Sequence, residues 1–308
     1  MNKPTILPFY YPTTVMCIDD AEDALRAVSG ILLADDLNVE SYFELGAALS
    51  HLNRKELLPT QNWLVRRDDE EYENEWLQSI QFQKIHHQLF DNNRHKQISV
   101  VIVDYDMPQM NGLEFCKKIT NPYTRKILLT GVADEKIGID ALNCGVIHQY
   151  LRKQDSGLPQ KIRAAVKLAQ QQYFQHIGAQ ISYTYQNDPE CLLFYDKGVE
   201  YLAAVAQRAT EYYMWCASGS YIFFDEIGCK KSGFIVKSIK RLEADVELTE
   251  DIASPALLKD LREKRKLLRN PPNYSFRALS QKDLDNIAFP AKPVPNLPKF
   301  FVAENIDP

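Results

Sequence analysis

The sequence predicts an α/β fold, a doubly wound five-stranded parallel sheet, followed by a smaller α+β domain. Apolar segments of strand length alternate with segments whose apolar residues recur at helical spacing through the first half. Residues Val100 to Val103 are β-branched throughout, with Ile98 before them, as is typical of a strand buried on both faces. Acidic, hydroxyl and lysine side chains follow these strands, at the carboxyl edge where parallel sheets bind ligands and hold catalytic residues.

The predicted elements alternate regularly along this half. The expected strands are residues 13–20, 38–45, 95–108, 125–131 and 146–153. The expected helices are residues 21–33, 48–53, 111–119, 134–145 and 158–174, the fourth ending on Gly145. Residues 54–97 interrupt the alternation, and we interpret them as a polar insertion. Within it, residues 69–90 have helical potential, with Trp76, Ile80 and Ile85 as contacts.

Composition limits the classes of function. The chain has 308 residues, 45% hydrophobic and 25% charged, and a net charge of −5, which argues against a general electrostatic grip on nucleic acid. We expect no membrane contact and a cytoplasmic location, because no apolar run is long enough to span a bilayer and the N-terminus lacks a signal-peptide pattern. Six cysteines without a CxxC pair indicate free thiols.

Five side chains end the predicted strands. Asp19 and Asp20 end the first, Asp104 the third, Thr130 the fourth and Lys153 the fifth. Three converging carboxylates repel one another, and Mg²⁺ is the hard cation that such oxygens hold. The lysine and the hydroxyl suit phosphoryl oxygens, so Asp104 can act as a nucleophile on phosphorus.

At these positions the chain resembles bacterial response regulators with a CheY-like, flavodoxin-like receiver domain. The segment DYDMPQMNG, residues 104–112, matches the family's D-x-x-M-P-x-M-x-G pattern, and the acid pair, the threonine and the lysine follow in matching order. The resemblance implies that Asp104 is the phosphoacceptor and that Asp19, Asp20 and Asp104, with the backbone carbonyl of Asp106, hold Mg²⁺. It also implies that Thr130 and Lys153 contact the phosphoryl group, that Thr130 and Tyr150 form the switch, and that the partner is a sensor histidine kinase or a phosphotransfer protein.

The chain departs from the family pattern in several places. The insertion separates the acid pair from Asp104 and puts a standard second helix in doubt. Gln154 replaces the proline that usually follows the lysine, and Asp106 and Val132 flank the path of an attacking water. The alternative to a site is that the acids are ordinary strand-end residues and Tyr150 an ordinary sheet aromatic. The adjacent His86 and His87 lack the spacing of a helical metal site.

The second half is less informative. We predict a receiver domain over residues 1–156, a connecting helix over 157–180 and an α+β output domain over 181–308. An apolar stripe, Ile162, Val166, Ala169, Tyr173 and Ile177, indicates either a connecting or dimer-forming helix or a simple amphipathic one. Residues 196–210 predict a helix capped by Asp196, residues 211–238 a three-stranded meander, residues 254–269 a basic helix capped by Ser254, and residues 289–301 an extended, Pro-rich tail. The meander with its SGS turn resembles the outputs of stand-alone response regulators of α-hydroxyketone quorum-sensing systems, as in Legionella.

Three functions remain open for the output domain. It binds a partner or ligand under control of phosphorylation, it binds DNA or RNA through residues Lys230 to Arg269, or it is an unrecognised enzyme. Residues 230–269 hold an excess of basic over acidic side chains, but we favour a solvated helix with paired charges as the explanation. The sequence carries no GGDEF, EAL or GYP segment, P-loop or nucleophile elbow. We therefore expect no enzymatic activity beyond the receiver's own phosphorylation and dephosphorylation. We also expect a homodimer that phosphorylation tightens.

Overall fold

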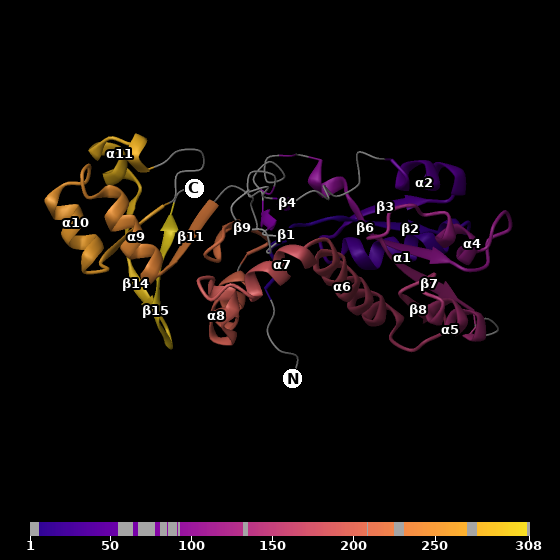
Figure 1. The fold of residues 1–308 in the computed structure, drawn as a ribbon. Coiled ribbons are helices and arrows are strands. Elements are labelled where there is room, and N and C mark those ends of the chain that lie inside the picture. The colour runs from indigo at the N-terminus through magenta and orange to yellow at the C-terminus, as the bar shows by residue number, and fades with distance from the viewer. Residues whose placement is uncertain are drawn as a thin grey trace. The chain divides into compact units, whose positions relative to one another are not determined.

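The chain forms two compact units in the computed structural model (Figure 1). The structure describes residues 6–54, 64–66, 78–80, 85, 91, 93–131, 135–207, 209–224, 231–269 and 276–306. The first unit comprises Tyr11–Gln61 and Asp91–Ile177, and we call it the parallel unit. The second comprises Met1–Tyr10, Asn62–Phe90 and Gly178–Pro308, and we call it the antiparallel unit.

The parallel unit contains a five-stranded sheet in the order β3-β2-β6-β7-β8, with all neighbours parallel. Its strands are β2 (Thr14–Ile18), β3 (Asn38–Tyr42), β6 (Ile98–Asp104), β7 (Arg125–Thr130) and β8 (Gln149–Arg152). Its helices are α1 (Glu22–Leu33), α2 (Leu45–Leu52), α4 (Gly112–Lys117), α5 (Glu135–Asn143) and α6 (Leu158–Ile177). This order and the helices on both faces confirm the predicted flavodoxin-like fold.

Two hydrophobic clusters fix the helices to the two faces of this sheet. Helices α1 and α6 cover one face, packing against Val15, Val100 and Ile127. Helices α2, α4 and α5 cover the other face, packing against Met16, Val101 and Leu128. Every residue of β6 is buried, as the β-branched run predicts.

The apolar stripe of α6 faces this core and is not a free surface. Ile162, Val166 and Tyr173 are fully buried and Ala169 is 4% exposed. Three of them belong to the cluster that covers the sheet. The stripe is therefore buried within the parallel unit, as the simple amphipathic interpretation expects, and does not offer a free surface for a second chain. Helix α6 ends at Ile177, and the antiparallel unit resumes at Gly178. Sequence periodicity alone could not distinguish the two, since a sheet face and a second helix demand the same stripe.

The antiparallel unit is built on a six-stranded antiparallel sheet in the order β1-β9-β10-β11-β15-β14. Its strands are β1 (Phe9–Tyr10), β9 (Glu211–Cys216), β10 (Ser220–Phe224), β11 (Lys231–Ser238), β14 (Lys292–Val294) and β15 (Leu297–Ile306). Two smaller pairs are β4 (Leu64–Arg66) with β5 (Gln78–Ile80) and β12 (Lys266–Leu268) with β13 (Ala288–Pro290). The helices are α7 (Ala179–Gln186), α8 (Asp196–Ala206), α9 (Ile239–Thr249), α10 (Pro255–Arg262) and α11 (Gln281–Asn286).

The predicted meander is the central part of this sheet, β9-β10-β11. The Pro-rich tail is extended, and it forms the hairpin β14-β15, which pairs with β11. The N-terminal boundary differs from the predicted one, because Phe9 and Tyr10 pair with Tyr213 and Tyr212. Phe9 and Tyr10 therefore group with the antiparallel unit.

Several predicted elements need local correction. The second helix of the parallel unit is present as α2, despite the insertion after it. Within the predicted helix 69–90, Gln78–Ile80 is a strand, and Trp76, His86 and His87 lie outside the described residues. Residue Asp196 begins α8 without capping it, whereas Ser254 caps α10 by accepting the backbone N–H of Leu257. The basic helix ends at Arg262, because the chain turns there into β12.

Candidate functional site

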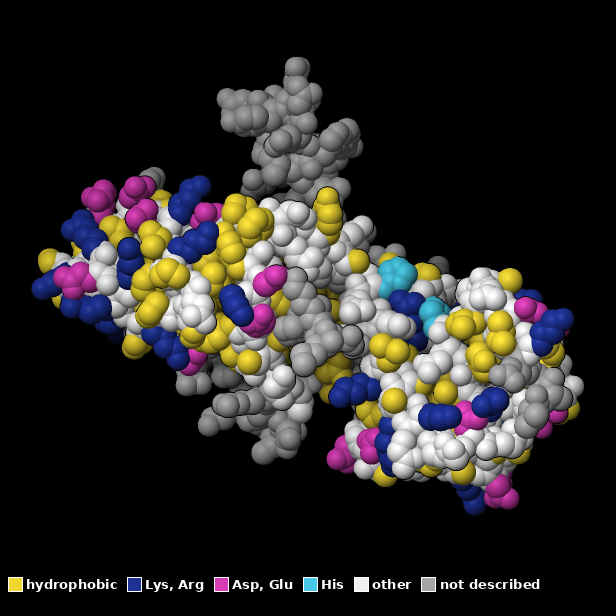
Figure 2. All heavy atoms as spheres, turned by 90° about the horizontal axis from the view of Figure 1, so that it is seen from below, with side chains coloured by type: hydrophobic (Ala, Val, Ile, Leu, Met, Phe, Trp, Pro, Cys, Tyr) yellow, Lys and Arg dark blue, Asp and Glu magenta, His cyan; other side chains and the backbone are white. Residues whose placement is uncertain are grey.

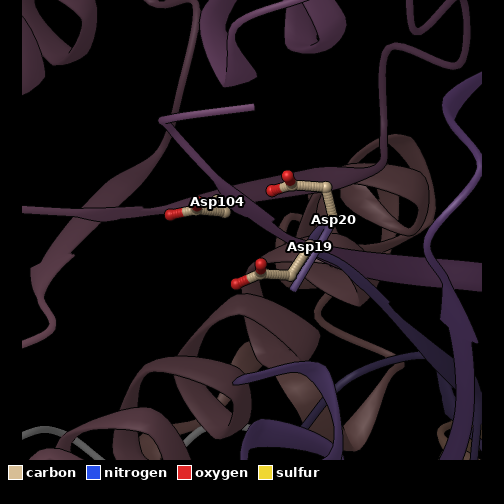
Figure 3. A group of neighbouring side chains, drawn as sticks. All are labelled: Asp19, Asp20 and Asp104. Atoms are coloured by element: carbon tan, nitrogen blue, oxygen red, sulfur yellow. The ribbon is translucent and has the colours of Figure 1, made fainter. Parts of the chain in front are cut away.

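Three carboxylates meet at the carboxyl ends of β2 and β6, and Figure 3 shows them together. One oxygen from each of Asp19, Asp20 and Asp104 lies within 4.8 Å of the others. Asp19 and Asp104 are buried, and Asp20 is exposed. The Asp19 carboxylate also accepts the backbone N–H of Ala21 at 2.9 Å, which fixes it at the start of α1. The parallel pairing of β2 with β6 brings these residues together across the intervening chain.

Lys153 supplies the positive charge of this cluster. Its Nζ lies 2.8 Å from Asp104 Oδ1 and 3.1 Å from Asp19 Oδ2. Burial raises the pKa of Asp104, while the hydrogen bond and charge of Lys153 counteract the rise and the charge of Asp19 adds to it. Burial disfavours the charge of Lys153, but Asp104 and Asp19 outweigh burial and raise the pKa of the ammonium. Burial and Lys153 thus act in opposite directions on Asp104: burial favours the neutral acid, and the Lys153 ammonium favours the carboxylate.

Thr130 ends β7 beside the cluster and is fully buried. Its Oγ1 has no hydrogen-bond partner among the described residues. A buried hydroxyl without a partner is uncommon in folded proteins and costs free energy. The Thr130 hydroxyl is therefore available to donate a hydrogen bond to a group that binds at this edge of the sheet.

Tyr150 lies on β8, half-buried against the core cluster beneath α5. Its ring approaches Gly138 of α5 so closely that a Cβ on that glycine would lie 3.2 Å from Tyr150 Cγ. Because Gly138 has no side chain, the Tyr150 ring can pack directly against α5.

The loop after Asp104 is shaped by Gly112, the last residue of the DYDMPQMNG segment. A Cβ on Gly112 would lie 2.2 Å from the backbone oxygen of Asp104. The Gly112 N–H donates to the Tyr105 carbonyl at 2.9 Å, and the Asn111 side chain caps α4 by accepting the N–H of Glu114. Asp106 is exposed in this loop, and Val132 lies outside the described residues.

Comparison with known families defines the class of this unit. Residues 70–167 match the family described as "Response regulator receiver domain". The match begins after Asp19 and Asp20, and the sheet order places their strand beside β6. The chain therefore contains a CheY-like response regulator receiver domain, the receiving module of two-component signalling.

Two relatives extend this result. The response regulator LqsR of Legionella pneumophila is similar over the whole chain, with a TM-score of 0.69 and 26% identity, covering 100% of this chain and 91% of LqsR. A stretch of 68 residues is 35% identical to the "Uncharacterized transcriptional regulatory protein YesN" of Bacillus subtilis (strain 168). That stretch covers 21% of this chain and 18% of the relative. Among the described helices, none has the length and apolar character needed to cross a membrane.

Proposed function

We propose that this protein is a phosphorylation-regulated response regulator that accepts a phosphoryl group on Asp104 from a sensor histidine kinase or a phosphotransfer protein. The observation that carries the proposal is the meeting of Asp19, Asp20, Asp104 and Lys153 beside the unpartnered hydroxyl of Thr130. Phosphoryl transfer needs a nucleophile, a cation that binds phosphoryl oxygens and a hydrogen-bond donor. The Asp104 carboxylate, the Lys153 ammonium and the Thr130 hydroxyl supply these at one edge of the sheet.

The acidic cluster fits Mg²⁺. Opposite ligands of an octahedral Mg²⁺ stand about 4.2 Å apart, and the three carboxylate oxygens lie within 4.8 Å of one another. We assign Asp19, Asp20, Asp104 and the backbone carbonyl of Asp106 as its protein ligands. When bound, the ion neutralises charge on the phosphoryl oxygens.

The protein's own groups then divide the work of phosphoryl transfer. A carboxylate oxygen of Asp104 forms a bond to phosphorus as the bond between phosphorus and the donor's leaving group breaks, which leaves an acyl phosphate. The Lys153 ammonium, already 2.8 Å from Asp104, binds a phosphoryl oxygen without having to be brought in. The Thr130 hydroxyl donates to another, worth about 1.5–3 kcal/mol for a charged acceptor.

Phosphate labelling tests this proposal. The full chain, incubated with a small phosphodonor such as acetyl phosphate, should take up one acid-stable, base-labile phosphoryl group only when Mg²⁺ is present. Asp104→Asn should abolish the label, because the amide is not a nucleophile, and Asp20→Asn should weaken Mg²⁺ binding. Undiminished labelling of Asp104→Asn would contradict the assignment.

The switch and the dimer are part of the same proposal. Movement of Thr130 toward the phosphoryl group opens space into which Tyr150 turns, and the α5–β8 face changes shape. Ile137, Ile139 and Leu142 of α5 are 37%, 42% and 39% exposed, so this helix, and not the buried stripe of α6, offers apolar surface for a second copy. Sedimentation with and without beryllofluoride, a phosphoryl mimic, measures how far phosphorylation tightens the dimer. Equal monomer–dimer constants with and without the mimic would contradict this part of the proposal.

For the output we favour binding of a partner or ligand by the antiparallel unit. The whole-chain similarity to the response regulator LqsR supports a role in response regulation. The quorum-sensing role is proposed on the resemblance of the meander and its SGS turn. Binding of nucleic acid through Lys230–Arg269 is the second candidate, but Arg265 pairs with Asp260 and Glu263, and Lys266 with Asp260. Figure 2 shows basic and acidic side chains intermixed over this unit. Salt-dependent binding to generic DNA would favour that candidate.

A further inference from the structure

The turn that carries Lys153 is closed by the carboxylate of Asp155. The Asp155 N–H donates to the Arg152 carbonyl at 3.1 Å, which makes residues 152–155 a tight turn. Arg152 Nε donates to Asp155 Oδ1 at 2.9 Å, and Lys161 Nζ donates to Asp155 Oδ2 at 2.6 Å. Each oxygen of one carboxylate thus holds a different cation, one at the end of β8 and one in the first turn of α6.

This bridge is anchored on both sides of the site lysine. The Asp155 side chain is 16% exposed, although the Arg152 and Lys161 side chains are 43% and 46% exposed. The hydrogen bond from Lys161, with the charges of Arg152 and Lys161, lowers the pKa of Asp155, so its carboxylate is charged at neutral pH. The bridge therefore joins a strand end to a helix start across the residue that lies between them.

Lys153 occupies the second position of this turn. Its backbone N–H donates to the Thr130 carbonyl at 2.9 Å, and its ammonium contacts both Asp104 and Asp19. A lysine side chain is long and has many rotamers, so its ammonium stays in place only when the backbone from which it extends is fixed. The next residue is the exposed Gln154, which has no ring to restrict the backbone.

We propose that Asp155 is a positioning residue that holds the 152–155 turn so that the Lys153 ammonium remains on Asp104 and Asp19. This inference rests on the proposed function. An exposed ion pair alone stabilises little, but this carboxylate accepts two hydrogen bonds, one from each of two elements, and so closes the turn. Loss of the bridge frees the lysine, and two consequences follow. Phosphoryl transfer slows, and the acidic cluster binds Mg²⁺ more tightly because a competing cation has left it.

The experiment uses the full chain with Asp155→Asn, Asp155→Glu, Lys153→Ala and the double variant Asp155→Asn/Lys153→Ala. Gln154→Ala, at the exposed neighbouring position, is the matched control. Phosphorylation by acetyl phosphate should slow about tenfold in Asp155→Asn and about a hundredfold in Lys153→Ala. The double variant should be no slower than Lys153→Ala, because Asp155 acts through that lysine. Asp155→Glu should recover much of the rate.

Calorimetric titration with Mg²⁺ gives a second reading that a merely structural role would not produce. Affinity should rise about two- to threefold in Asp155→Asn, rise further in Lys153→Ala and stay unchanged in Gln154→Ala. If Asp155→Asn unfolds, Lys161→Gln removes one arm of the bridge and should shift both readings in the same directions by less.

Wild-type rate and wild-type Mg²⁺ affinity in Asp155→Asn would overturn the inference. So would a double variant whose loss of rate is the product of the two single losses. If the wild type binds Mg²⁺ but accepts no phosphoryl group, the proposed function fails, and the Mg²⁺ affinities still decide whether Asp155 holds Lys153.

Discussion

Replacing Gly112 with alanine should destabilise the parallel unit, although alanine is the better helix former. The new Cβ would lie 2.2 Å from the Asp104 backbone oxygen and 2.8 Å from Leu128 Cδ1. Ordinary contacts of this kind exceed about 3.2 Å, so α4 must move away from β6 by about 1 Å. That movement also stretches the 2.9 Å hydrogen bond from Gly112 to the Tyr105 carbonyl.

The expected magnitude combines three effects. Overpacking costs about 1–3 kcal/mol, and weakening one backbone hydrogen bond costs about 1 kcal/mol. The gain in helix propensity returns about 0.5–1 kcal/mol. The net destabilisation is about 2 kcal/mol, a factor of roughly 30 in the equilibrium between folded and unfolded states. Gly30, within α1, is the matched control, because a Cβ there meets nothing within 4 Å. Gly30→Ala should stabilise the same unit by about 0.5–1 kcal/mol.

Native-state hydrogen exchange of β6 measures both effects, because its fully buried amides exchange only when the parallel unit opens. Exchange of residues 98–104 should be about 30-fold faster in Gly112→Ala and slightly slower in Gly30→Ala. Exchange at the wild-type rate in Gly112→Ala would refute the steric argument. Equal acceleration in both variants would show that any change of a helical glycine is harmful and that the contact with Asp104 is irrelevant.

Two further predictions concern titratable groups, the half-buried His148 and the buried pair Lys237 and Asp245. Burial, with the charges of Arg125 and Lys126 and of the nearby His176, lowers the pKa of His148 to about 4, so the unfolded chain binds this proton first as the pH falls below about 6.5. The free energy of unfolding should therefore fall by up to about 2 kcal/mol between pH 8 and pH 5. Denaturant unfolding of His148→Gln should show a pH dependence smaller by that amount. The same pH dependence in the variant and the wild type would exclude His148 as the cause. In the antiparallel unit, Lys237 and Asp245 form an ion pair with side chains 3% and 8% exposed. Lys237→Met alone should lower the free energy of unfolding by about 3–5 kcal/mol, measured by denaturant unfolding, because it leaves the Asp245 carboxylate buried without its cation. The double variant Lys237→Met/Asp245→Leu should recover most of this loss. Equal losses in the single and double variants would show that the unpaired carboxylate is not the source.

The sequence by itself determined the parallel sheet and the members of its site. The β-branched run of β6 demands burial on both faces, and only a sheet covered by helices on both sides provides it. Side chains that end parallel strands must meet at one edge, so Asp19, Asp104 and Lys153 could be grouped without coordinates. Both inferences depend on local pattern and on the fixed geometry of parallel strands.

Tertiary structure alone decided the features that depend on which surfaces meet. The stripe of α6 is equally compatible with a sheet face or a second helix, and only packing showed that it covers the sheet. The pairing of Phe9 and Tyr10 with β9, and of the Pro-rich tail with β11, joins segments whose own composition names no partner. The bridge from Asp155 to Arg152 and Lys161 likewise needed the turn geometry. Secondary structure follows from neighbours in sequence, whereas edge pairing and ion bridges follow from proximity in space, which a single sequence does not encode locally.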